Sequence, residues 1–277
     1  MNKAHILTIG AAVRDVFLTS PGFAIIRSPQ FSTGYGECVA LGAKIEVEQC
    51  VFATGGGATN AAATFSHLGF STSVLAKIGN DEPGEAILLD LKAHGIATTH
   101  VKREKKGSTA YSTLLTTSSG ERSVLVFRGV SAEWKESDIP PLSDTITSLY
   151  ITSLGGNLEV LEKILERAKK KNIRVAINPG SSELKQGAAF LRLLPLISIL
   201  ILNKEEAQLL TAKAKADVPT LAATLHRLCP TVVITDGAQG SYAHDANDLW
   251  FSRTSSVKSL SRTGAGDAFG SGFVAAT

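Results

Sequence analysis

A single aspartate near the end of the chain follows a run of small residues. The stretch TGAGDAFGSGF has one acid, Asp267, and three small residues stand directly before it: Gly264, Ala265 and Gly266. An apolar run follows, so these residues are expected to form the first turn of a helix. Such a turn leaves backbone N–H groups unpaired at the positive end of the helix dipole, where a phosphate can bind. Asp267 could then accept the proton of an attacking hydroxyl. A plain helix start with tightly packed glycines is the alternative.

A second glycine-rich stretch, GGGATNAAATF, lies in the first quarter of the chain and includes Gly56, Gly57 and Asn60. Consecutive glycines let the backbone approach a ligand closely. The Asn60 amide can donate and accept hydrogen bonds at once, which suits a sugar hydroxyl. A glycine turn with Asn60 as a helix cap remains open as the other interpretation.

The elements that must position these two stretches follow from an alternation of patterns. Short apolar runs typical of buried strands recur at HILTI, TSVLA, LYIT, VAIN, ISILIL and TVVIT. Helical periodicity separates most of them, and in LEVLEKILERAKKK one face carries Leu158, Leu161, Ile164, Leu165 and Ala168. Alternating strands and helices predict an α/β fold whose mostly parallel sheet is covered by helices on both sides.

Two segments break this alternation, at about residues 16–52 and 102–127. Both are rich in β-branched and aromatic residues punctuated by glycine and serine, and SSGER reads as a hairpin turn. Neither contains a crossover helix, so we expect them to form a small sheet apart from the main one. Residues 1–277 are expected to form one α/β domain, which includes these two segments.

Composition excludes several classes of protein. The formal net charge of +3 over 277 residues gives no electrostatic case for nucleic acid or an anionic membrane. The three cysteines are far apart and lack metal-type spacing, which argues against a disulfide framework and a zinc site. The histidines are equally dispersed, so we expect no metal held by a cluster of side chains. No secretory signal and no apolar run long enough to span a bilayer is found, so we expect a cytosolic protein.

Two signatures in the right order carry a resemblance to a known family. The first, GGGATNAA with Gly69 and Gly79 at the matching intervals, resembles the N-terminal signature of the ribokinase-like (PfkB) carbohydrate kinases, and TGAGDAFGSGF resembles their C-terminal signature. Four smaller pieces extend the resemblance along the chain: IGAAVRD with Asp15, KIGNDEPG with Asp81 and Gly84, LNKEEA with Asn203 and Glu206, and ITDGAQG with Thr235, Gly237 and Gly240. Taken singly, each piece is better explained as a turn, a helix cap or a hairpin, but together and in family order they favour a function.

The resemblance implies a three-layer α/β sandwich with a small β lid over a sugar site, and a homodimer paired through that lid. It implies a kinase that transfers the γ-phosphoryl group of ATP to a sugar hydroxyl. Asp267 would be the general base, and Gly264, Ala265 and Gly266 would hold the transferring group. The other implied roles are sugar binding by Asp15, Gly56, Gly57 and Asn60, nucleotide-side contacts by Asn203, Thr235, Gly237 and Gly240, and a Mg²⁺ site at Glu206 that is reached through water.

The chain departs from the family pattern in two places. Members commonly read D-T-T-G-A-G-D, whereas this chain has Ser261 and Arg262 before Thr263. The first aspartate of that motif often helps to hold a monovalent cation, so Ser261 weakens the case for one. The sequence also stops at Thr277, where family members usually continue for some tens of residues, so we expect a C-terminally truncated chain or an incomplete nucleotide site.

Other functions stay open at this point. A nucleoside kinase would share both signatures, and a non-catalytic sugar-binding protein would keep the lid site without competent ATP binding. A nicotinamide-dependent dehydrogenase would explain the strand and helix alternation, but the first strand is followed by Gly10 and AAVRD, not G-x-G-x-x-G. P-loop and α/β-hydrolase motifs are also lacking.

Overall fold

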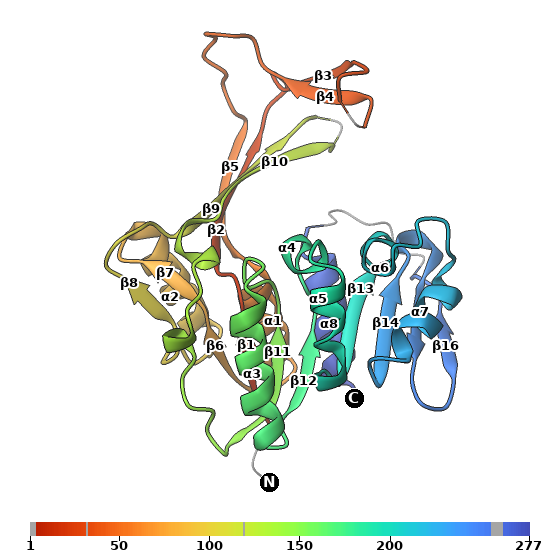
Figure 1. Cartoon of the computed structure of the whole chain (residues 1–277). Coiled ribbons are helices and arrows are strands. Elements are labelled where there is room, and N and C mark those ends of the chain that lie inside the picture. The colour runs from red at the N-terminus through yellow and green to blue at the C-terminus, as the bar shows by residue number, and fades with distance from the viewer. Residues whose placement is uncertain (1–3, 32, 119, 256–262) are drawn as a thin grey trace.

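A large sheet forms the centre of the molecule (Figure 1). The computed structural model describes residues 4–31, 33–118, 120–255 and 263–277. The strand order is β16-β15-β14-β13-β12-β11-β1-β6, and β15 runs antiparallel to its two neighbours, β14 and β16. The strands are β1 (His5–Ile9), β6 (Ser71–Leu75), β11 (Ile146–Ile151), β12 (Arg174–Ile177), β13 (Ile199–Asn203), β14 (Thr231–Thr235), β15 (Ser241–His244) and β16 (Leu249–Ser252). All six predicted strands are confirmed, and they run parallel to one another.

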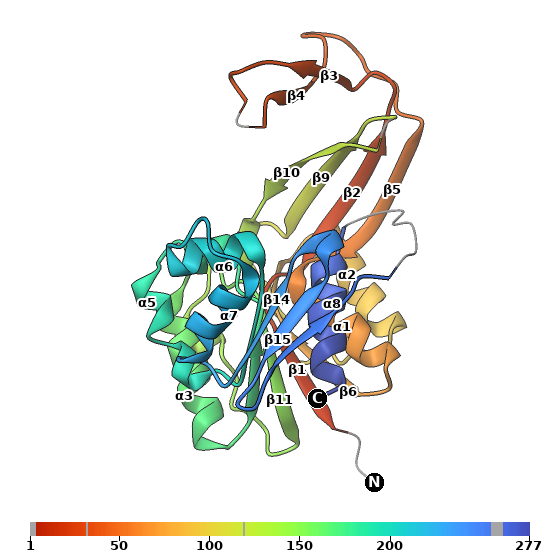
Figure 2. The ribbon, with the colours of Figure 1, turned by 90° about the vertical axis from the view of Figure 1, so that its right-hand side faces the viewer.

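Helices cover both faces of this sheet, as Figure 2 shows. One layer consists of α3 (Leu158–Lys170), α4 (Ser181–Leu184), α5 (Ala188–Leu191), α6 (Lys204–Thr211) and α7 (Val218–His226). The other consists of α1 (Gly57–His67), α2 (Glu82–Ala93) and α8 (Ala265–Ala275). The three-layer α/β sandwich is therefore confirmed. Short 3-10 turns complete the connections: η1 (Gly129–Ala132), η2 (Glu136–Asp138), η3 (Leu194–Leu196) and η4 (Gly237–Gln239). Within the described ranges, no helix has the length and apolar character to cross a bilayer.

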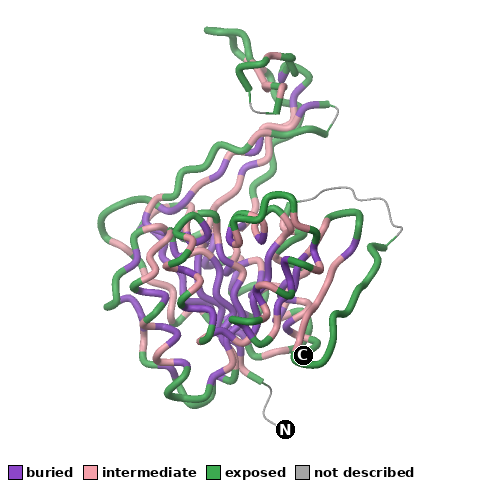
Figure 3. Tube along the Cα trace, turned by 45° about the vertical axis from the view of Figure 1, so that its right-hand side comes forward, coloured by how far each residue is buried: buried purple, intermediate pink, exposed green. Residues whose placement is uncertain are grey.

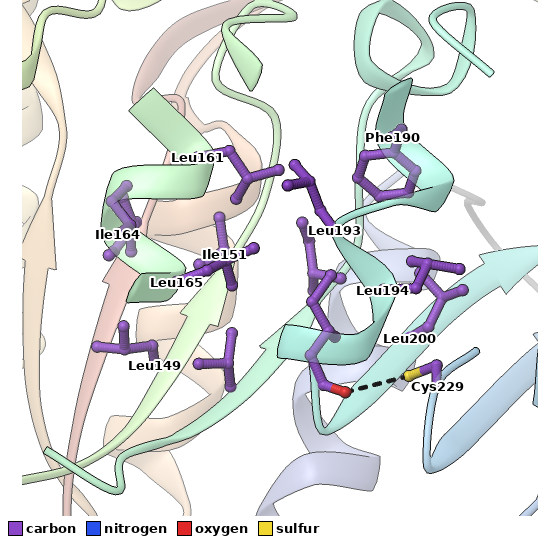
Figure 4. Packing of buried hydrophobic residues seen from close by; sticks show 14 of the residues in the cluster. Leu149, Ile151, Leu161, Ile164, Leu165, Phe190, Leu193, Leu194, Leu200 and Cys229 are labelled. Atoms are coloured by element: carbon purple, nitrogen blue, oxygen red, sulfur yellow. Dashed lines mark hydrogen bonds between the residues drawn. The ribbon is translucent and has the colours of Figure 1, made fainter. Parts of the chain in front are cut away.

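Helix α3 shows how the sequence pattern builds the core. Its Leu161, Ile164 and Leu165 are fully buried and belong to the same apolar cluster as Leu149 and Ile151 of β11 (Figure 4). Burying each of these side chains contributes roughly 1.5–3 kcal/mol. The predicted apolar face is largely confirmed, although Val160 is buried and Leu158 only partly so.

A second sheet stands away from this body, and most of its outer part is exposed (Figures 1 and 3). Its strand order is β10-β9-β2-β5. We call this sheet the lid. Its strands are β2 (Val13–Thr19), β5 (Gln49–Gly55), β9 (Ala110–Thr116) and β10 (Arg122–Phe127). The expected separate sheet is confirmed, as is the hairpin turn between β9 and β10.

The boundaries expected for the lid segments need correction. Strand β8 (Lys102–Glu104) pairs with β7 (Lys77–Gly79) beside the body, so the second lid segment begins at β9. The middle of the first segment forms a separate hairpin of β3 (Ala24–Arg27) and β4 (Tyr35–Cys38). The composition of both segments predicts strands correctly. Which strand pairs with which depends on contacts between residues far apart in the sequence.

Candidate active site

Helix α8 begins at the point where the lid meets the body. Its N-cap, Gly264, has φ 73° and ψ 0°, a left-handed conformation that favours glycine. Glycine at the N-cap has no side chain with which to cap the helix, and the N–H groups of a first helical turn can bind an anion. Asp267 lies in that first turn, and burial raises the pKa of its carboxyl group. The predicted helix start is confirmed.

Helix α1 brings Asn60 to the same place. Its N-cap is Gly56, with φ 104°, where a Cβ would lie 2.4 Å from the Ala11 carbonyl oxygen. The Asn60 amide does not cap α1 but donates from Nδ2 to Oδ2 of Asp267 across 2.8 Å. This hydrogen bond favours the ionised carboxylate and opposes the effect of burial on the pKa of Asp267. The interpretation of Asn60 as a cap is therefore wrong.

Strand β2 supplies the third polar group, Asp15. Its carboxylate lies directly against Gly55 of β5, where a Cβ would come within 1.9 Å of Oδ2. Burial raises the pKa of Asp15, and a hydrogen bond from Ser112 of β9 works against that rise. Gly55, the first of the three consecutive glycines, thus makes room for the Asp15 side chain.

Two adjoining cavities open between the lid and the start of α8, with volumes of about 250 and 390 Å³. Asp15, Thr263 and Gly264 line both of them. Asn60 lines the smaller cavity and Gly56 the larger. The residues expected to hold an acceptor are therefore gathered here. Gly57 is the exception, because it lines neither cavity and its missing side chain lets α1 pack against Thr152.

A cavity of about 400 Å³ lies against the first turn of α8 and the end of β14. We call it the nucleotide-side cavity, after the nucleotide contacts that the family resemblance implies for Thr235, Gly237 and Gly240. Among the residues that line it are Thr235, Gly237, Gly240, Arg253, Ala265, Gly266 and Phe269. Successive residues of one turn thus line different cavities, since Gly264 lines those under the lid and Ala265 and Gly266 line this one. An anion at this turn can be reached from both.

Asn203 and Glu206 form a reciprocal capping box at the start of α6. The Asn203 side chain accepts from the Glu206 N–H, and Oε2 of Glu206 accepts from the Asn203 N–H, both at 2.8 Å. Burial raises the pKa of Glu206. Asn203 pairs in register with Thr235, which places this box one strand from the nucleotide-side cavity.

Other predicted motifs have structural explanations. Asp81 caps α2 by accepting from the Gly84 N–H, and its carboxylate also accepts from the backbone N–H of Thr109. Gly237 and Gly240 do form a turn between paired strands, yet both also line the nucleotide-side cavity. Ser261 and Arg262, on which the argument about a monovalent cation rests, lie outside the described residues.

Several site residues were missed from the sequence. Phe17 follows Asp15 by two positions in β2, so strand periodicity could have placed it on the same face. No comparable signal marked Arg122, which lines the larger cavity under the lid. Tyr150 of β11 is fully buried, and its hydroxyl has no hydrogen-bond partner among the described residues. Burial and the charge of Asp267 raise the Tyr150 pKa.

The fold is a three-layer α/β sandwich with a lid, and the first turn of α8 lines cavities on two sides. Proteins of this class can bring a polar acceptor and an anion to a single carboxylate, here that of Asp267. The pfkB family carbohydrate kinase model matches residues 3–277. The chain therefore belongs to the pfkB family of carbohydrate kinases, and it is a sugar kinase by family. Its recognition from the two signatures is confirmed.

Individual relatives and solved structures are also similar to this chain. A ribokinase from Haemophilus influenzae is 27% identical over 230 residues, which cover 81% of this chain and 74% of the relative. The crystal structure of adenosine kinase from Sinorhizobium meliloti has a TM-score of 0.78 at 22% identity, covering 99% of this chain and 87% of that one. A ribokinase from Cryptococcus neoformans in complex with ADP has a TM-score of 0.71 at 20% identity, covering 98% and 86%. The two solved structures support the fold.

Proposed function

We propose that this chain transfers the γ-phosphoryl group of ATP to a hydroxyl group of a sugar. The observation that carries the proposal is the first turn of α8, whose residues line cavities on the lid side and on the nucleotide side while Asp267 lies in the same turn. An acceptor in one cavity and a phosphate in the other would meet at this carboxylate.

The acceptor is held under the lid. Asp15 and Asn60 supply an acceptor and a donor for sugar hydroxyls, and Gly56 leaves the backbone accessible beside them. Gly57 contributes by letting α1 pack against Thr152, which fixes the position of Asn60 one turn later. Because each of these groups belongs to a helix or paired strand, the acceptor meets a preorganised site.

Asp267 accepts the proton of the attacking hydroxyl as the new oxygen–phosphorus bond forms. The bond between the γ-phosphorus and the bridging oxygen breaks, and ADP leaves with that electron pair. The N–H groups at Gly264, Ala265 and Gly266 stabilise charge on the transferring group. The Asn60 hydrogen bond favours the ionised form of the Asp267 carboxylate, which is the form that can accept the proton.

ATP and Mg²⁺ are the expected donor and cofactor. The nucleotide-side cavity fits a phosphate chain, since Thr235, Gly237 and Gly240 face the open start of α8 across it. The ribokinase solved with ADP supports the nucleotide assignment. Mg²⁺ would be bound largely by phosphate oxygens and water, with Asn203 and Glu206 positioning that water.

A nucleoside acceptor is the second candidate. Phe17 lines the smaller cavity under the lid, and Leu114 and Val124 line the larger, so an apolar or planar group would find contacts there. The structural similarity to an adenosine kinase is in keeping with this candidate. Both candidates use the same carboxylate and the same helix start.

We also propose that the lid pairs with the lid of a second copy. Edge strand β10 exposes apolar side chains on both faces of the lid, and an exposed apolar edge strand can pair with another chain. These side chains are Val124, Leu125, Val126 and Phe127. Sedimentation of the protein should show a dimer, and Leu125→Lys should shift it toward the monomer.

ATP consumption in the presence of Mg²⁺ tests the proposed function directly. The acceptor panel contains ribose, fructose, other hexoses, sugar acids and nucleosides. Acceptor-dependent ADP formation, with a phosphorylated product identified by mass spectrometry, is the expected result. Acceptor binding without any phosphorylated product would contradict the proposal.

A further inference from the structure

Arg122 lies at the far end of the larger cavity under the lid. It is the first residue of β10 and pairs with Thr116 of β9, whereas Asp15 is level with Ser112 of the same strand. Four residues separate these levels, which is about 13 Å along the strand at roughly 3.3 Å per residue. Both side chains nevertheless line the same cavity of about 390 Å³.

The charges in this cavity are separated by an apolar stretch. Asp15 and Arg122 are the ionisable residues among those that line it, and Leu114 and Val124 lie on the same inner face of the lid. The acidic end, at Asp15 and Gly264, is where the reacting hydroxyl would lie. The cationic end therefore meets the part of the acceptor that does not react.

Arg122 has no ion-pair partner within the part of the chain that the structure describes. Glu37 and Glu121 line the adjoining cavity at the lid tip together with Arg122, but neither is within ion-pair distance of it. By contrast, Arg103 and Arg167 on the body are paired with Glu85 and Glu136. A guanidinium group at the rim of a cavity, with no ion-pair partner among the described residues, is available to a ligand.

We propose that Arg122 selects an acceptor that carries an anionic group, a carboxylate or a phosphate, at the end remote from the hydroxyl that becomes phosphorylated. Arginine matches both anions because its planar fork can make two parallel hydrogen bonds to two oxygens. Asp15 favours hydroxyl groups at the other end and disfavours an anion there, which fixes the direction in which the acceptor enters. The inference rests on the proposed kinase function and specifies its substrate class.

The test measures binding first, without ATP, so that it does not depend on turnover. Titration calorimetry compares fructose, fructose 6-phosphate and gluconate on the unmodified protein. We expect at least one anionic probe to bind about tenfold or more tightly than fructose, since charge-assisted pairs contribute about 1.5–3 kcal/mol. The preference should weaken as salt is added. Whichever of gluconate and fructose 6-phosphate binds more tightly identifies the anion.

Three variants assign the preference to one side chain. Arg122→Gln should abolish it, and Arg122→Lys should retain part of it because the charge remains. Arg14→Gln is the matched control, because Arg14 lies on the opposite face of the same sheet, over the Phe52 ring. Equal binding of neutral and anionic probes, no binding of either anion, or an unchanged preference in Arg122→Gln would each overturn the inference.

A turnover measurement separates this inference from the proposed function. Phosphorylation of fructose with no preference for an anionic acceptor leaves the kinase proposal intact and removes the role of Arg122. An anion preference in binding that disappears in Arg122→Gln, with no phosphorylated product from any probe, supports the role of Arg122 and contradicts the kinase proposal. Tighter binding of adenosine than of either anionic probe would also overturn the inference.

Discussion

The Asn60 amide donates a hydrogen bond to the Asp267 carboxylate across 2.8 Å, although the two residues are 207 positions apart in the chain. This bond joins the first turn of α1 to the first turn of α8. It links the two glycine-rich stretches at the level of side chains. The proposed base and the amide proposed to hold the acceptor therefore belong to one hydrogen-bonded unit.

Replacing Asp267 by Asn should lower kcat by roughly a hundredfold to ten-thousandfold, because the amide cannot accept the hydroxyl proton. Steady-state ADP release measures the effect, and thermal unfolding checks the fold. The matched control is Asp217→Asn, which alters the cap of α7. If turnover of Asp267→Asn matched that of the control, Asp267 would have no part in the chemistry.

Replacing Asn60 by Ala should move the acid limb of the kcat/KM profile to higher pH. The base must be ionised, so the rate rises with pH through the pKa of Asp267. Burial already raises that pKa and the Asn60 hydrogen bond opposes the rise, so removing the bond raises it further. Asn157→Ala, which removes the cap of α3, should leave the limb in place. An unmoved limb in Asn60→Ala would contradict this assignment.

Replacing Gly266 by Ala should weaken the use of ATP without harming the fold. A Cβ at Gly266 meets nothing within 4 Å in the protein, but it would enter the nucleotide-side cavity. We expect kcat/KM for ATP to fall about tenfold or more, as when an anion-binding group is disturbed. Gly272→Ala in the same helix is the control, since its Cβ also meets nothing within 4 Å. Equal ATP kinetics in the two variants would show that the first turn of α8 does not hold phosphate.

Replacing Glu206 by Gln should raise the Mg²⁺ concentration needed for half-maximal rate several-fold, because a carboxylate orients metal-bound water better than an amide does. Glutamine can keep the capping box with Asn203, so the helix should persist. Glu205→Gln, at the neighbouring exposed position, provides the comparison. An identical Mg²⁺ dependence in both variants would leave Glu206 with a capping role only.

Replacing Asp81 by Ala should lower the free energy of unfolding by about 1–2 kcal/mol, the usual cost of losing a helix cap. Burial alone would raise the pKa of Asp81, but hydrogen bonds from Thr109 and Gly84 lower it overall. The ionised group thus stabilises the fold above its unfolded pKa of about 3.9, and this contribution is lost as the pH falls through the lower folded value.

Urea unfolding of Asp81→Ala and the unmodified protein at neutral and acidic pH measures this difference. It should be largest near pH 7 and shrink below about pH 4. Turnover should change little in this variant. A strong loss of turnover at unchanged stability would instead place Asp81 in the site.

The sequence determined the local elements of this protein. Six apolar runs became the parallel strands of the main sheet, and the pattern of α3 predicted most of its buried face. Glycine placed the starts of α1 and α8 correctly, because Gly56 and Gly264 occupy positive φ angles at the two N-caps. Such features depend on neighbours within a few residues, so periodicity and backbone preference suffice to predict them.

Only the tertiary structure decided which of these elements meet. It paired Asn60 with Asp267 and placed Arg122 in the same cavity as Asp15. It also turned Gly264 toward the cavities under the lid and Ala265 toward the nucleotide-side cavity. It also paired Lys102–Glu104 with β7, away from the lid. Each of these outcomes depends on strand order, register and the approach of α1 to α8, which are set by packing between segments distant in sequence.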